Sequence, residues 1–127
     1  MMRELEKQLE PWIRSGRSDL DTAALLINEA RLTEGLFFCL LAVEKALIAH
    51  AVRLTGQTPA RSSNVLELLN LTHIRVGEKD SQLLEILLDC EVALRYPVED
   101  DDITTVNQAF EYLDRTRELL LWLERTL

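Results

Sequence analysis

The stretch Phe37–His50, FFCLLAVEKALIAH, decides the fold of this 127-residue chain. It continues the unbroken apolar run Leu36–Val43, and apolar residues resume after Glu44 and Lys45. Neither Pro nor Gly interrupts it, and its commonest residues are Ala and Leu, the strongest helix formers. A helix that is apolar on nearly all sides is normally buried on nearly all sides. The stretch therefore predicts the central helix of a bundle, with the other helices packed around it.

The segment before the central helix predicts a first long helix from Trp12 to about Arg31, because its apolar residues recur at helical spacing. Pro11 fits the first turn of that helix, where its missing N–H costs nothing. Arg3–Glu10 is therefore predicted as a separate lead-in. Gly16, inside the first helix, indicates a place where another backbone approaches closely.

The later helices are marked mainly by their caps and stops. Thr33 is expected to cap the central helix and Gly56 to end it. A third helix is predicted over Val65–Leu71, with a cap from Ser62-Ser63-Asn64. A fourth is predicted over Ser81–Leu94 and is ended by Arg95-Tyr96-Pro97. The last is predicted over Ile103–Thr126, after the acidic run Glu99–Asp102. We expect an all-α fold: a single domain over residues 1–127 that forms an up-and-down helical bundle of about five helices.

Composition and charge exclude several classes of protein. Apolar residues make up 47% and charged residues 28% of the chain, an ordinary balance for a soluble domain. The net charge of −8 argues against general nucleic-acid binding, which needs a clustered basic face. The charged N-terminal segment does not resemble a signal peptide, and Glu44 and Lys45 interrupt the longest apolar stretch before it reaches the length of a membrane span. A cytoplasmic protein without a membrane partner is expected.

Few residues could carry catalysis or bind a metal. His50 in the central helix and His73 in a loop belong to no nucleophile–base pattern, so a structural or surface role is expected for each. Cys39 and Cys90 lie among apolar residues and are expected to be buried, reduced thiols. The sequence has neither metal-ligand spacing nor a glycine-rich phosphate loop. We therefore predict no catalytic residue, no metal and no cofactor.

Two polar features remain, and they supply the candidate ligand- or partner-binding residues: Glu44, Lys45, Arg95, Tyr96 and Pro97. A charge inside a core is costly unless it is paired, so Glu44 and Lys45 need a partner, the rim of the bundle or a subunit boundary. The plainest interpretation has Lys45 reaching solvent while Glu44 pairs with an arginine. Arg95-Tyr96-Pro97 is either a simple helix stop or an Arg and a Tyr offered to a phosphate at one end of the bundle.

These features also form a family pattern. Its parts are Trp12 followed by Ser18-Asp19-Leu20, Ala23 and Leu25-Leu26, then Phe38 with Ala42, Glu44-Lys45-Ala46-Leu47 and Ala49, then Gly56 and Pro59, and finally Arg95-Tyr96-Pro97. Over nearly its whole length the chain resembles HEPN-domain proteins, which are small α-helical bundles.

The chain departs from that family pattern at positions that matter for chemistry. Leu40-Leu41 stand where the family has a Gln pair, Ile48 where it has a Lys and Asn64 where it has a His, which favours an apolar interface over a polar ligand site. Many HEPN proteins are metal-independent ribonucleases with an Arg-x(4–6)-His motif. That motif is missing, because Asp101 lies six residues after Arg95. Without the imidazole the acid–base partner is lost, so ribonuclease activity is not predicted.

The resemblance then implies the non-catalytic branch of the family. Its members form homodimers and resemble the partner of a minimal nucleotidyltransferase in a toxin–antitoxin-like pair, and a nucleotide-binding role is implied as well. An over-apolar central helix in a small bundle also favours a symmetric dimer. Two alternatives stay open: a metal-independent ribonuclease with a non-standard site at Arg95 and Tyr96, and a stand-alone nucleotide-binding regulator.

Overall fold

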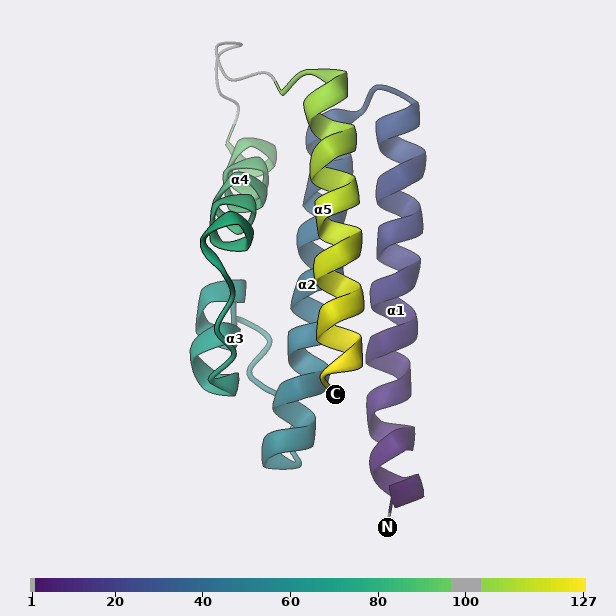
Figure 1. The fold of residues 1–127 in the computed structure, drawn as a ribbon, viewed down its shortest axis with the longest axis vertical. Helices are drawn as coiled ribbons and strands as arrows, with labels where there is room; N and C mark the ends of the chain where they lie inside the picture. Colours follow the sequence, from purple (N-terminus) through teal and green to yellow (C-terminus); the bar gives the residue numbers. More distant parts are fainter. Residues whose placement is uncertain (1, 97–103) are drawn as a thin grey trace.

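The computed structural model describes residues 2–96 and 104–127, and these form five helices (Figure 1). The helices are α1 (Met2–Asn28), α2 (Leu32–Thr55), α3 (Val65–Thr72), α4 (Glu78–Arg95) and α5 (Val106–Arg125). The described residues contain no strand. The prediction of an all-α bundle of about five helices is confirmed.

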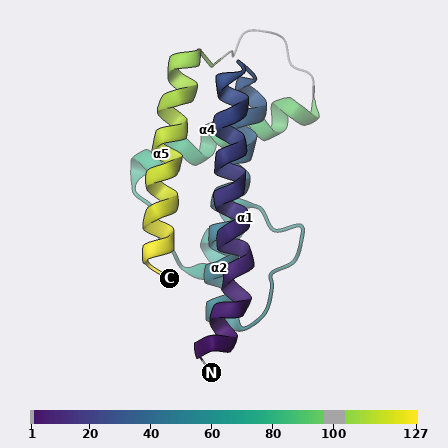
Figure 2. The same cartoon turned by 90° about the vertical axis from the view of Figure 1, so that its right-hand side faces the viewer.

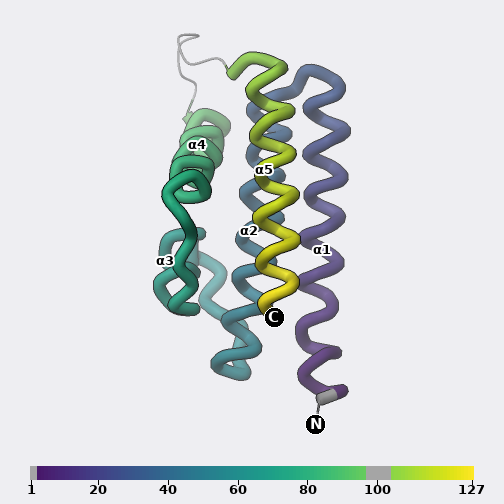
Figure 3. Tube along the Cα trace, in the orientation of Figure 1, coloured from purple at the N-terminus to yellow at the C-terminus, as the bar shows by residue number. Residues whose placement is uncertain are grey.

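Three long helices run along the long axis of the molecule. Figure 3 traces α1 in one direction and both α2 and α5 in the other, so the two termini lie at the same end. Figure 2 shows that α4 instead crosses α2 at a steep angle, and that its C-terminal end projects to one side of the bundle. The short helix α3 lies against the lower half of α2 in Figure 1.

The central helix is α2, as its sequence predicts. It packs against all four other helices, and its fully or nearly fully buried residues are Gly35, Leu36, Cys39, Leu40, Ala42, Val43, Ala46, Leu47, Ala49, Ala51 and Val52. By length and composition alone α2 could cross a membrane, so the expectation that Glu44 and Lys45 break its apolar character too early for a span is wrong. Inside the bundle, 61% of its most apolar stretch is buried, which is what the core helix of a bundle shows.

Two glycines let α1 and α2 approach each other closely. A Cβ atom on Gly16 would lie 3.3 Å from the Ala42 carbonyl oxygen of α2, so the close approach predicted at Gly16 is confirmed. Gly35 on α2 is tighter, because its Cβ would lie 2.6 Å from the Ile27 side chain and 3.1 Å from the Ala23 carbonyl oxygen. At both positions a side chain larger than hydrogen would force the two helices apart.

Helix α1 does not start again at Pro11 but runs through it, so the predicted separate lead-in is wrong. A proline inside a helix removes one backbone hydrogen bond, here to the carbonyl of Lys7. The helix persists because Leu5 and Leu9, before the proline, pack in a small apolar cluster with Ala49 and Val52 of α2. Burial of these side chains offsets the lost hydrogen bond.

The caps agree with the sequence at most helix ends. Gly56 ends α2 at φ +75°, Asn64 accepts a hydrogen bond from the Glu67 N–H at the start of α3, and α4 ends at Arg95. The predicted Thr33 cap is wrong, because α2 begins at Leu32 and Arg31 precedes it without a side-chain cap. Thr105 caps α5, while Pro97, the acidic run Glu99–Asp102 and the predicted start at Ile103 lie outside the described residues.

Candidate interaction site

Lys45 does not reach solvent but turns toward α1. Its Nζ donates a hydrogen bond to Ser15 Oγ at 2.7 Å and lies 2.6 Å from Asp19 Oδ2. Asp19 is only 9% exposed, so this is an ion pair largely removed from water. The Asp19 oxygen receives no well-directed hydrogen bond, which makes the contact mainly electrostatic. The interpretation of Lys45 as a solvent-reaching side chain is wrong: Lys45 neutralises a buried carboxylate and ties α2 to α1.

Glu44, the preceding residue, turns toward α4 and has no such partner. Within residues 2–96 and 104–127 no cation lies within 4 Å of its carboxylate, so the expected pairing with an arginine is wrong. Burial, and to a smaller extent the nearby carboxylate of Glu91 on α4, raises the pKa of Glu44 to about 7. A carboxyl group with this pKa is partly protonated at neutral pH. Whatever fraction of Glu44 is ionised has no cation within 4 Å among the described residues.

Arg95 and Tyr96 lie at the projecting end of α4. Both are exposed, with 67% of Tyr96 accessible to solvent. Arg95 follows Glu91 by four residues, so the two side chains share one side of α4. The third residue of the predicted group, Pro97, lies outside the described residues. Because Glu91 lies near Glu44, Arg95 and Glu44 are on the same side of the molecule, whereas Lys45 faces α1.

A surface that we call the α2–α4 face unites these groups. It is the surface around Glu44 of α2 and Glu91 of α4, whose charges are close enough to interact, with Phe37 and Leu41 on the same side of α2 as Glu44 and Arg95 on the same side of α4 as Glu91. Phe37, Leu41 and Glu44 are spaced at i, i+4 and i+7, which places them on one side of a helix. Phe37 and Leu41 are half-buried, and among the described residues neither belongs to a core cluster or packs against one.

Sequence reasoning missed Phe37, Leu41 and Glu91 as members of this face. One signal was present, since the replacement of a Gln pair by Leu40-Leu41 already favoured an apolar interface. The structure separates the two leucines: Leu40 is fully buried in the core, whereas Leu41 stays half-exposed on the α2–α4 face.

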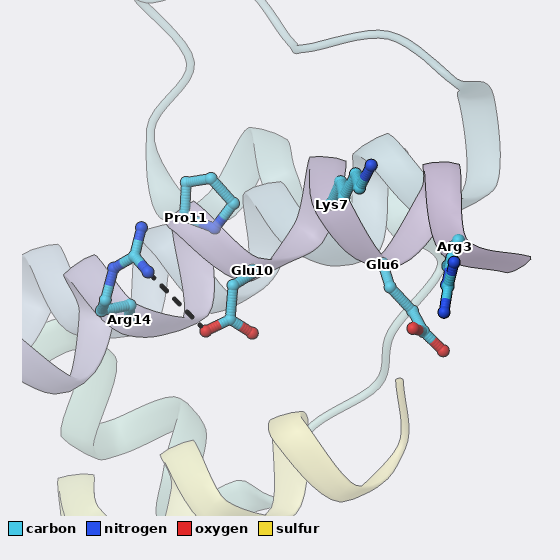
Figure 4. Close-up of a pocket in the computed structure, with 6 residues that line it drawn as sticks. All are labelled: Arg3, Glu6, Lys7, Glu10, Pro11 and Arg14. Carbon is cyan, nitrogen blue, oxygen red and sulfur yellow. Dashed lines mark ion pairs between the residues drawn. The ribbon is translucent and has the colours of Figure 1, made fainter.

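Two hollows on the surface of the described residues lie elsewhere and are poorly suited to a small ligand. One, of about 480 Å³, is lined by α1 alone, by Arg3, Glu6, Lys7, Glu10, Pro11 and Arg14 (Figure 4). The other, of about 280 Å³, runs between α1 and α5 beside the paired side chains of Arg17 and Glu124. Charges of both signs alternate along each hollow. Ligand sites instead enclose an apolar pocket with a few convergent polar groups.

The histidines and cysteines have structural surroundings. His50 Nε2 donates to the Leu123 carbonyl of α5 at 2.7 Å, and burial lowers the His50 pKa. His73 is exposed and ends α3 with a φ of 58°. Burial raises the pKa of the Cys39 thiol to about 12 and that of Cys90 to about 11, which keeps both protonated and unreactive. In the part of the chain that the structure describes, no group of three metal-ligating side chains occurs.

An all-α bundle with a buried central helix, paired to its neighbour through Lys45 and Asp19, is the class of protein that these observations define. The family model of the HEPN domain matches residues 9–126, and the chain therefore belongs to the HEPN domain family. This membership supports a nucleotide-related or ribonuclease-like module. Neither the curated proteins nor the solved structures gave a significant match.

Proposed function

We propose that the chain is a HEPN-type interaction module: a homodimer that binds a minimal nucleotidyltransferase subunit in a toxin–antitoxin-like pair, with a nucleotide at their junction. The observation that carries the proposal is the α2–α4 face. There the central helix leaves Phe37 and Leu41 half-exposed, and among the described residues no cation lies within 4 Å of the Glu44 carboxylate. Apolar side chains left exposed on an otherwise buried helix are a feature of surfaces that another protein covers.

A binding role is favoured over catalysis by the surroundings of the acid–base candidates. The imidazole of His50 is held by a backbone carbonyl of α5. Arg95 and Tyr96 stand on the open surface, where no low-dielectric site would strengthen their interactions with a transition state. A ribonuclease with a non-standard site at these two residues is therefore the weaker candidate.

The nucleotide part of the proposal rests on Arg95 and Tyr96. A guanidinium group binds phosphate through two parallel hydrogen bonds, and an exposed tyrosine ring offers a surface on which a base stacks. Arg95 and Tyr96 lie at the C-terminal end of α4, however, where the helix dipole is unfavourable for an anion. We therefore place the nucleotide at the junction with the enzyme subunit, which would supply the remaining contacts, rather than on this chain alone.

The test is a pull-down of the tagged chain from its native host at low salt, followed by mass spectrometry of what is bound. We expect a nucleotidyltransferase subunit in the eluate of the wild type. Calorimetry of the reconstituted pair with ATP and GTP should then show binding that Arg95→Ala removes and Arg75→Ala, the matched change at an exposed arginine between α3 and α4, leaves unchanged. Recovery of the chain without any nucleotidyltransferase contradicts the proposal.

A further inference from the structure

Helix α5 ends differently from α2 and α3, which are each closed by a residue in the left-handed conformation. Thr126, just after α5, keeps a helical backbone, so the last carbonyl groups of the helix need other donors. Two side chains of α2 supply them. His50 Nε2 donates to the Leu123 carbonyl at 2.7 Å, and Arg53 Nη1 donates to the Thr126 carbonyl at 3.2 Å. We call the contact between His50 and Leu123 the His50 cap.

The His50 cap holds the end of α5 over the small apolar cluster at the end of the molecule where both termini lie (Figure 3). Leu9 of α1 and Ala49 and Val52 of α2 are buried in this cluster, and Leu127, two residues after α5, packs against them. Because His50 directly follows Ala49, the hydrogen bond of its ring ties the last turn of α5 to the helix that forms the cluster. A helix end of this kind opens locally without unfolding the rest of the bundle.

The groups that surround the His50 ring in the described chain give little support to a positive charge. From α5 the ring meets the Leu123 carbonyl and, at 3.4 Å, the Thr126 hydroxyl, and neither group titrates. Glu124, the acid in the last turn of α5, instead binds Arg17 of α1. The neighbouring cluster contributes apolar side chains: Leu5, Leu9, Trp12 and Ile13 from α1, and Ile48, Ala49 and Val52 from α2.

A proton on the half-buried His50 ring would place a positive charge near Arg53, which lies about one turn further along α2. Burial is the largest influence on the pKa of His50 and lowers it. The hydrogen bond to Leu123 raises this pKa, the charge of Arg53 lowers it, and the balance leaves it below its usual value. The charged ring is therefore more stable in water than in the closed cap.

We propose that the His50 cap is acid-sensitive: a neutral ring holds the last turn of α5 on α2, and uptake of one proton by the ring releases that turn and uncovers the apolar cluster beneath it. The cap works within one chain and depends on neither the proposed partner nor the proposed dimer. It contributes its full stability above about pH 6.5, and it loses this stability as pH falls from there through the lowered pKa of His50 in the folded chain.

The experiment is an NMR titration of the full chain from about pH 8 to about pH 5, which follows the His50 ring and the amides of Thr126 and Leu127. In the wild type, both amides should move toward the positions of an unfolded peptide and lose protection against hydrogen exchange, with the same midpoint as the ring. His50→Gln offers an amide donor to the Leu123 carbonyl but takes up no proton, so its last turn should stay closed throughout.

His73→Gln is the matched control, because it removes the other histidine, which is exposed at the end of α3. Its Thr126 and Leu127 amides should titrate as in the wild type. Arg53→Gln removes the opposing charge and keeps a donor for the Thr126 carbonyl, so the turn should remain closed to a lower pH than in the wild type. Glu44, which also titrates near pH 7, is unchanged in every variant, so its titration is common to all of them.

Protonation of the His50 ring without any movement of the Thr126 and Leu127 amides would mean that the charged ring keeps its hydrogen bond, and the acid-sensitive cap would be overturned. Equal movement of these amides in His50→Gln would overturn it too, because a different group would then be responsible. If the turn of His50→Gln is already open near neutral pH, Arg53→Gln decides. An amide transition at lower pH than in the wild type supports the proposal, and an unchanged transition contradicts it.

Discussion

Glu44 and Lys45, two consecutive residues of the central helix, differ in whether an opposite charge lies beside them. Lys45 turns to α1 and finds a buried carboxylate, Asp19, at 2.6 Å. Glu44 turns to α4, where burial, and to a smaller extent the carboxylate of Glu91, raises the pKa of Glu44 to about 7. On the α1 side Lys45 has a counter-ion, whereas on the α4 side no cation of the described residues lies within 4 Å of the Glu44 carboxylate. Under the proposed function, folding alone neutralises the buried charge on the α1 side, whereas the α4 side is covered by association with another chain.

The largest expected contrast between the two sides of α2 is that between Leu40 and Leu41. Leu40 is fully buried in the core, so Leu40→Ala should lower the free energy of unfolding by about 3 kcal/mol or more. Leu41 is half-exposed on the α2–α4 face, so Leu41→Ala should cost less than about 1 kcal/mol but weaken the dimer. Urea titration and sedimentation equilibrium measure the two effects. Equal costs of unfolding would mean that Leu41 is a core residue and would break the comparison.

The next effect concerns the satisfied charge. Asp19→Ala leaves Lys45 half-enclosed without its counter-ion and should lower the free energy of unfolding by about 2 kcal/mol. Lys45→Met together with Asp19→Leu should recover most of this loss, because no unpaired charge remains. Asp21→Ala, on the exposed side of the same helix, is the control and should change little. A loss no larger than that of the control would show that the pair contributes nothing to the packing of α1 on α2.

The smallest effect concerns the unsatisfied charge and its pH dependence. Since the pKa of Glu44 is raised to about 7 by folding, the folded chain binds more protons than the unfolded chain between about pH 4.5 and pH 7. The free energy of unfolding of the diluted, monomeric chain should therefore fall as pH rises through this window. Glu44→Gln should remove the fall and, with its partial exposure taken into account, gain about 1 kcal/mol near pH 8.

The matched control is Glu85→Gln, on an exposed position of α4, which should leave the pH profile of stability as it is in the wild type. A Glu44→Gln variant that is less stable than the wild type at high pH would mean that the carboxylate has a favourable partner. The side of α2 that faces α4 would then pair its charge just as the side that faces α1 does.

The fold was predictable because its signals are local and agree with one another. The unbroken apolar run of α2, the cap at Asn64 and the stop at Gly56 each follow from the sequence within a few residues of where they act. The prediction that a new helix starts at Pro11 was wrong because the effect of a proline on a helix depends on packing against residues far away in the sequence. The cluster of Leu5 and Leu9 against α2, which holds α1 together through the proline, is a tertiary contact with no local sign.

The candidate site was predictable only in part, for a geometric reason. Sequence identified Glu44 and Lys45 as charges in need of partners, yet consecutive residues of a helix point about 100° apart and meet different neighbours. Which one faced α1 and which faced α4 depended on how the helices pack. Arg95 and Tyr96 were placed at the end of α4 as predicted, whereas Phe37 and Leu41 looked like ordinary core residues in an apolar run.

The most direct test of the claim that association completes the α4 side of α2 is the mass of the wild-type chain in solution. Sedimentation equilibrium over a range of micromolar concentrations should give twice the 14.6 kDa of one chain, dissociating only on dilution. A mass of 14.6 kDa at every concentration would contradict the account. The α2–α4 face would then have to be explained without a second copy.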